Sequence, residues 1–188
     1  MKKIFSIAIL LTTILSFGQK PCVLDTDVTD SLGTYKSTKS YQIFERSFAG
    51  NSTRIFFSLA SDNGIIALDF QLIQQSEDFI KAFCIDKNTK LYLQLNNGKI
   101  VTLLHAGKDT CGTLVRNEKG NNRLTHGTFV FAKENYEDLK TSKVTFMRVS
   151  ANGETIDYPF KTEFTSELDN IKYEPENYFI DYLKCVDN

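Results

Sequence analysis

Few residues in this sequence have the types and spacing that catalysis requires. The chain contains two histidines, His105 and His126, and four cysteines. A cysteine nucleophile needs a nearby base, and His105 stands six positions before Cys111. No G-x-S-x-G motif marks a nucleophilic serine. A small secreted hydrolase that uses His105 or His126 is therefore our alternative hypothesis, second to a non-enzymatic function.

The cysteines favour a structural role. Cys22, Cys84, Cys111 and Cys185 form an even set, which in an exported chain indicates disulfides. Three pairings are possible. We favour Cys84 with Cys111, which closes a short loop, and Cys22 with Cys185, which ties down both ends; free core thiols are the alternative. No C-x-x-C or H-x-x-x-H pair indicates a zinc site.

Acidic and aromatic residues give weaker signals. Asp25, Asp27 and Asp30 form a cluster that lacks the glycine and distal glutamate of an EF-hand loop, so we expect a solvated turn and neither metal nor cofactor. Carbohydrate-binding platforms use large flat aromatic rings, and the chain has no tryptophan. The tyrosines that could replace it are Tyr35, Tyr41, Tyr92 and Tyr136.

The charge balance argues against nucleic acid as a partner. Lys and Arg number 22, Asp and Glu number 23, and the net charge is −1. The basic residues are dispersed, and no glycine-rich phosphate loop is present. We expect an unknown protein or small ligand as the partner.

The first residues have the pattern of a secretory signal peptide. A Met-Lys-Lys start precedes an apolar run over residues 4–14, and small residues precede an expected cleavage after Gly18. The run is shorter than the roughly 20 residues of a membrane-spanning helix. We expect residues 1–18 to be removed, and residues 19–188 to form one β-rich domain, secreted or periplasmic, without membrane insertion.

Three Asn-Gly dipeptides between strand-like runs predict β-hairpins, because a type I′ turn needs positive φ at both central residues. They are Asn63-Gly64, Asn97-Gly98 and Asn152-Gly153. Each turn fixes the register and therefore the faces of both strands. In the third hairpin Arg148 lies opposite Asp157. The pairs expected on one apolar face are Ile55 with Leu72, Phe57 with Phe70 and Leu59 with Leu68 in the first, and Leu91 with Leu104, Leu93 with Thr102 and Leu95 with Ile100 in the second.

Shorter patterns predict the other elements. Pro175 suits the first position of a C-terminal helix, whose apolar stripe includes Phe179 and Leu183.

The stretch 107–122 is long for a loop, and such loops are often functional. The candidate site residues in this loop and on either side of it are His105, Asp109, Cys111 and His126. The remaining expectations are strands over 41–48 and 124–132, a short helix over 133–140, a loop over 26–40, and either helix or strand over 76–84.

Several stretches resemble one group of proteins: the FGQ end of the signal peptide, LYLQLNNGKIVTLL, and ENYEDLKTSKVTFMRVS followed by GETIDYPF. They are similar to small exported proteins of unknown function that are common in Bacteroidetes. The likeness covers roughly residues 91–186. It implies an exported, mostly β domain and supplies no catalytic residues.

Together these patterns predict a mainly β (α+β) protein. Antiparallel hairpins form a sandwich-like or curved sheet, and a C-terminal helix packs on it. The function we expect is non-enzymatic binding or interaction through a loop or a sheet edge. Besides the hydrolase, an inhibitor or immunity-type partner of another secreted protein is a third possibility.

Overall fold

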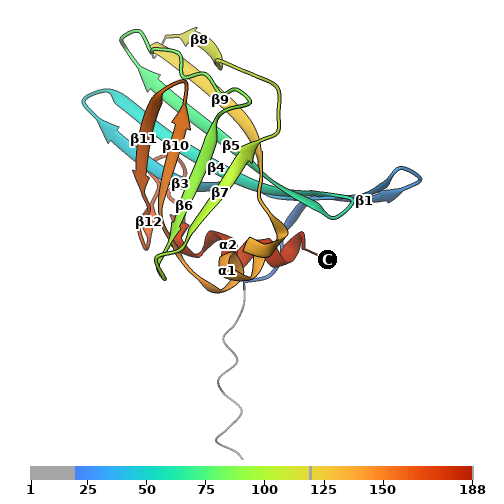
Figure 1. Cartoon of the computed structure of the whole chain (residues 1–188). Helices are drawn as coiled ribbons and strands as arrows, with labels where there is room; N and C mark the ends of the chain where they lie inside the picture. The colour runs from blue at the N-terminus through green and yellow to red at the C-terminus, as the bar shows by residue number, and fades with distance from the viewer. Residues whose placement is uncertain (1–19, 119, 188) are drawn as a thin grey trace, which may run out of the picture.

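The computed structural model describes residues 20–118 and 120–187, and the expected signal peptide lies outside them. Antiparallel strands make up most of the fold, which confirms the predicted class (Figure 1). The helical segments are η1 (Lys133–Asn135), α1 (Tyr136–Thr141), η2 (Pro175–Asn177), α2 (Tyr178–Tyr182) and η3 (Leu183–Cys185). The strands are β1 (Leu24–Asp30), β2 (Gly33–Thr38), β3 (Tyr41–Phe48), β4 (Asn51–Asp62), β5 (Ile65–Ser76), β6 (Lys90–Leu95), β7 (Ile100–His105), β8 (Thr113–Asn117), β9 (Gly120–Val130), β10 (Val144–Ala151), β11 (Glu154–Pro159), β12 (Phe164–Thr165) and β13 (Lys172–Tyr173).

The main sheet folds over into two layers. Its strand order is β1-β2-β4-β5-β9-β7-β6-β10-β11, with β3 also paired to β4 and β8 to β9. Strands β9 and β7 join the layers through the residue pairs Leu104 with Val130 and His105 with Phe129. Figure 1 shows β6, β7, β10 and β11 crossing in front of β3, β4 and β5.

The core lies between these layers. The Phe44 ring of β3 lies 5.2 Å from the Tyr158 ring of β11, measured between centroids. The α1 and α2 helices close one end of the core (Figure 1). There Phe57 of β4 lies 5.6 Å from Tyr178 and 6.2 Å from Phe179. Burial of each such side chain stabilises the fold by about 1.5–3 kcal/mol.

Two of the three predicted hairpins have the expected register. In the first, β4 and β5 pair Leu59 with Leu68 and Phe57 with Phe70, and these four side chains are fully buried. In the third, β10 and β11 place Arg148 opposite Asp157. Asn63 and Asn152 adopt φ of 50° and 49°, as the type I′ turn requires.

The register predicted for the second hairpin is wrong by one residue. Strands β6 and β7 pair Leu93 with Val101 and Gln94 with Ile100, because three residues rather than two form the loop. The Leu95 amide donates to the Lys99 carbonyl at 2.8 Å, and Gly98 has φ of 85°. A single extra residue exchanges the two faces of a strand. The side chains at 101 and 103 are therefore buried, and those at 100 and 104 are exposed.

Two segments expected to be loops contain strands. Residues 26–40 form most of the β1–β2 hairpin, and residues 107–122 contain β8 and the start of β9. The β1 and β8 side chains are mostly exposed, so neither strand has the apolar alternation that marks a half-buried strand. The β1–β2 hairpin projects from the body of the protein in Figure 1.

The remaining element predictions are largely confirmed. Strand β3 has the expected bounds, β9 begins four residues before the predicted start at 124, and short helices follow at 133–141 and after Pro175. Beyond Ser76, the segment up to Cys84 is neither helix nor strand. Among the described residues no helix is both long and apolar enough to cross a membrane.

Two disulfides hold segments that the sheet does not pair. Cys22 is bonded to Cys185, and Cys84 to Cys111, which is the pairing favoured from the sequence. The second bond fixes the irregular segment 77–89 beside the loop that leads to β8. Ile85 and Thr110 reinforce it with two backbone hydrogen bonds, of 2.7 and 2.9 Å.

Candidate functional site

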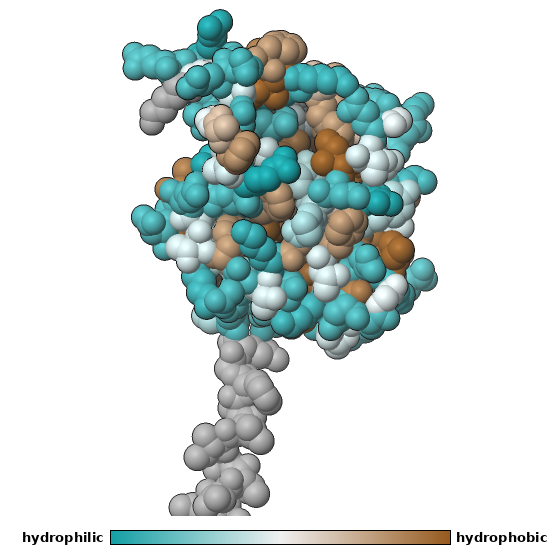
Figure 2. Space-filling view, turned by 90° about the vertical axis from the view of Figure 1, so that its left-hand side faces the viewer, coloured by the Kyte–Doolittle hydropathy of each residue, from teal (hydrophilic) through white to brown (hydrophobic). Residues whose placement is uncertain are grey.

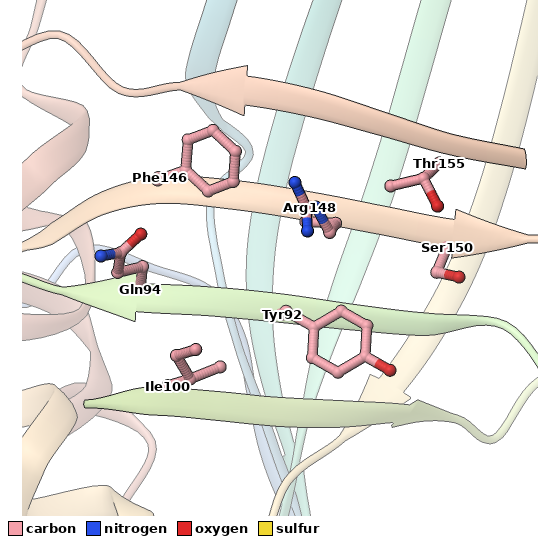
Figure 3. Close-up of a pocket in the computed structure, with 7 residues that line it drawn as sticks. All are labelled: Tyr92, Gln94, Ile100, Phe146, Arg148, Ser150 and Thr155. Atoms are coloured by element: carbon pink, nitrogen blue, oxygen red, sulfur yellow. The ribbon is translucent and has the colours of Figure 1, made fainter. Parts of the chain in front are cut away.

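The outer face of β7, β6, β10 and β11 contains a hollow of about 450 Å³. We call it the outer hollow. All seven lining side chains project from the same side of these four strands in Figure 3. They are Tyr92, Gln94, Ile100, Phe146, Arg148, Ser150 and Thr155.

Strand register explains why these side chains share one face. The core side chains Leu91, Leu93 and Val149 point inward, so their neighbours Tyr92 and Arg148 point outward. The ladders place Tyr92 opposite Arg148, and Arg148 opposite Asp157. Because neighbouring strands lie about 4.8 Å apart, four strands give a platform about 14 Å wide.

A fixed ion pair lies beside the hollow. Nε of Arg148 donates to Oδ1 of Asp157 at 2.7 Å, and Nη2 donates to Oδ2 at 2.8 Å. These hydrogen bonds raise the pKa of the Arg148 guanidinium and lower the pKa of the Asp157 carboxyl. The guanidinium carbon also lies 5.9 Å from the centroid of the Phe146 ring. Two parallel hydrogen bonds and an aromatic neighbour restrict the orientation of the arginine.

The outer hollow combines apolar surface with hydrogen-bonding groups. Tyr92 and Phe146 are partly exposed, and Ile100 retains 60% of its exposure. Gln94, Ser150 and Thr155 add uncharged donors and acceptors. Since Asp157 neutralises Arg148, this part of the platform carries no net charge. Such an arrangement can bind an uncharged ligand with one flat apolar side and a polar rim.

His105 lies in the interior of the protein. Only 9% of it is exposed, and its ring lies 5.4 Å from the Phe129 ring. Within residues 20–118 and 120–187, neither ring nitrogen has a hydrogen-bond partner. A general base must reach the proton that it removes, and no described hydroxyl or carboxylate hydrogen-bonds to His105.

His126 lies on the opposite face of β9 from Phe129 and His105. Its Nε2 atom is 3.7 Å from Oδ1 of Asp69, which also accepts a hydrogen bond of 2.7 Å from Oγ1 of Thr128. About half of the His126 side chain is exposed. A carboxylate beside an imidazole is one part of a hydrolytic site. Because His105 faces the core and His126 faces outward, the two imidazoles do not converge on a common nucleophile.

The other two predicted site residues lie in and beside the loop before β8. Asp109 is exposed, and Cys111 is bonded to Cys84 and offers no thiolate. The three residues therefore have different surroundings: His105 is buried, His126 lies beside Asp69, and Cys111 is disulfide-bonded. Whether this region is functional stays a prediction. Among the described residues, no group of three His, Cys, Asp or Glu side chains is placed to hold a metal ion.

The β8–β9 hairpin carries exposed apolar side chains. The solvent-exposed fraction is 54% for Val115, 44% for Leu124 and 41% for Leu114. Val115 and Leu124 share one side of the ladder, and Leu114 lies on the other. On the side of the molecule seen in Figure 2, hydrophobic residues form small areas separated by hydrophilic ones. Exposed apolar side chains in such small areas are common on protein surfaces.

The sequence analysis names some residues of the outer hollow but does not predict that they share one face. Tyr92 is among the tyrosines considered for carbohydrate binding, and the Arg148–Asp157 pair follows from the third turn. The predicted register separated these residues, because it placed Ile100 on the face of Leu93 and Val101 on the face of Tyr92. A three-residue loop at Asn97-Gly98 would have brought Ile100 and Tyr92 to one face.

No family model, no curated protein and no solved structure matches the chain.

Proposed function

We propose that the protein is an exported, non-enzymatic binding domain whose outer hollow binds a small uncharged ligand. One observation carries the proposal: aromatic and hydrogen-bonding side chains from four strands line one hollow on the outer face of the sheet, where Gln94, Ile100 and Arg148 are exposed. Binding pockets typically have volumes of about 300–1,000 Å³ and combine apolar walls with a few placed polar groups. The two disulfides support export, because such bonds persist in oxidising compartments.

The hollow has binding groups but lacks a reactive one. Arg148 is held by Asp157, and the remaining polar lining is amide and hydroxyl. Its seven described lining residues include neither a cysteine nor a histidine. Ordered strands also hold the platform rigid, and a rigid site loses little entropy when a ligand binds.

Screening of small uncharged compounds against ¹⁵N-labelled protein tests this function. We expect hits whose amide shift changes centre on Tyr92, Gln94 and Arg148, and we expect Tyr92→Ala to weaken them. Hits that map elsewhere and ignore Tyr92→Ala would refute the assignment of the binding site. The disulfide-bonded chain over residues 19–188 is the form to use.

A small secreted hydrolase is the second candidate, and the contact between His126 and Asp69 favours it. In that case the protein hydrolyses p-nitrophenyl esters, and His126→Gln abolishes the activity. Activity that survives His126→Gln, or none in the unmodified protein, removes this candidate for ester substrates. His105→Gln is the matched control, because the His105 ring is buried and forms no hydrogen bond with any residue that the structure describes.

A further inference from the structure

We propose that the ligand of the outer hollow is an uncharged carbohydrate chain, with Tyr92 as the stacking ring and the Arg148–Asp157 pair as the main hydrogen-bonding group. The proposal rests on the function proposed above and specifies the class of ligand. It follows from three properties of the hollow: an aromatic surface, matched donors and acceptors, and a net charge of zero.

Tyr92 provides the aromatic surface. Its ladder partners are Thr102 on one side and Arg148 on the other, so its ring lies in the middle of the four-strand platform. The ring projects from the outer face of β6 in Figure 3. A pyranose has one side made of C–H groups, and such a side packs well on an aromatic face. Phe146 and Ile100 extend the apolar surface along the platform.

The ion pair provides the matched donors and acceptors. A sugar hydroxyl both donates and accepts, so a site for it benefits from both kinds of group close together. Arg148 offers N–H groups, Asp157 offers carboxylate oxygens, and their two mutual hydrogen bonds of 2.7 and 2.8 Å hold both in position. Charged groups also form stronger hydrogen bonds to a ligand than neutral groups do.

The charge of the hollow separates carbohydrate from other small ligands. A phosphate or carboxylate ligand needs an uncommitted cation, whereas Arg148 already has Asp157 as its partner. A lipid chain needs a mainly apolar surface, whereas Gln94, Arg148, Ser150 and Thr155 make up more than half of the seven lining residues. An uncharged ligand with many hydroxyl groups satisfies both conditions.

The test is an NMR titration of the ¹⁵N-labelled, disulfide-bonded protein. The four probes are cellotetraose, xylotetraose, mannotetraose and the tetramer of N-acetylglucosamine. We expect at least one of them to cause saturable shifts at the amides of Tyr92 and Arg148. Tyr92→Ala should weaken that binding by about tenfold or more, and Tyr92→Phe, which keeps the ring, by about threefold or less.

Tyr35→Ala is the matched control. Tyr35 is a partly exposed strand tyrosine that pairs with Asp62 in the other layer, and its replacement should leave the affinity unchanged. The variants are first compared with the unmodified protein by their ¹⁵N spectra, so that loss of folding is separated from loss of binding.

The possible outcomes distinguish this proposal from the broader one. If no tetrasaccharide shifts the hollow but uncharged compounds of other classes do, the carbohydrate assignment is overturned and the binding function stands. If neither group shifts it, both are overturned. If a tetrasaccharide binds but Tyr92→Ala binds it equally well, the assignment of Tyr92 is overturned.

Discussion

The disulfide between Cys84 and Cys111 allows a quantitative test of how segment 77–89 is held. We consider the double substitution Cys84→Ser and Cys111→Ser. Each serine is close in size to the residue that it replaces, and Cys111 is exposed, so direct packing losses are small. The native segment should stay in place, because Ile80, Phe83 and Ile85 remain buried and Ile85 keeps its backbone hydrogen bonds to Thr110.

The expected loss of stability then comes from the unfolded chain. The bond joins residues 27 positions apart, and closing a loop of that length removes about 3.5 kcal/mol of chain entropy from the unfolded state. The double variant should therefore lose about 3.5 kcal/mol in the free energy of unfolding. Because globular domains are stable by about 5–15 kcal/mol, this is a large fraction.

Urea denaturation followed by circular dichroism measures the loss. For a denaturant slope of about 1–3 kcal/mol per molar urea, the midpoint should fall by about 1.2–3.5 M. A fall of less than about 0.3 M would refute the argument from chain entropy. Hydrogen exchange at Ile85 and Thr110 provides the second measurement, and their protection should persist in the folded variant.

The Cys22–Cys185 bond is the matched comparison. It joins residues 163 positions apart, for which the same relation gives about 5 kcal/mol. Residues 20–23 are outside any strand and mostly exposed, so the folded variant also gains freedom when they detach. We therefore expect Cys22→Ser with Cys185→Ser to lose less than about 5 kcal/mol. A loss above that value would contradict the expected detachment.

Three further changes test the fold. Gly98→Ala should destabilise the protein by about 1 kcal/mol, because φ is 85° and no atom lies within 4 Å of the added Cβ; unchanged stability in urea would contradict the three-residue turn. Phe57→Ala should cost about 3–5 kcal/mol, since the ring is fully buried, and a cost below about 1 kcal/mol would contradict its packing. Burial alone would raise the pKa of Glu45. The hydrogen bonds that Glu45 accepts, of which the one from Arg54 has the largest effect, lower the pKa by more than burial raises it. The pKa in the folded state therefore lies below the ordinary 4.5. The folded state then binds fewer protons than the unfolded state, and stability falls as pH drops below about 4.5. Melting curves should show a shallower acid decline in Glu45→Gln, and an identical decline would exclude this carboxyl as the cause.

The sequence predicts the fold where turn chemistry and burial agree. At Asn63-Gly64 and Asn152-Gly153, the positive φ of asparagine and the alternation of apolar residues lead to the same register. At Asn97-Gly98 both faces of β7 carry aliphatic residues, so alternation could not correct the wrong loop length. Strand β1 was missed because its side chains are mostly exposed, and nothing in their pattern reports pairing.

The candidate site was less predictable because it depends on two registers at once, that of β6 with β10 and that of β10 with β11. Tyr92, Arg148 and Asp157 come from three strands and share a row only when both ladders are known. A tyrosine, an arginine and an aspartate occur on the surface of most β proteins, so their residue types alone do not indicate a binding site. His105 is the opposite case. A histidine suggests catalysis, but this one pairs with Phe129 and is buried.

The Cys22–Cys185 bond also determines how the protein responds to tension. A force applied outside these two cysteines passes through the covalent bridge, so the 162 residues between them carry no load. A cut made by a protease within that stretch leaves both fragments joined. The two ends of the chain would therefore stay joined after a single cleavage, until a reductant opens the bridge.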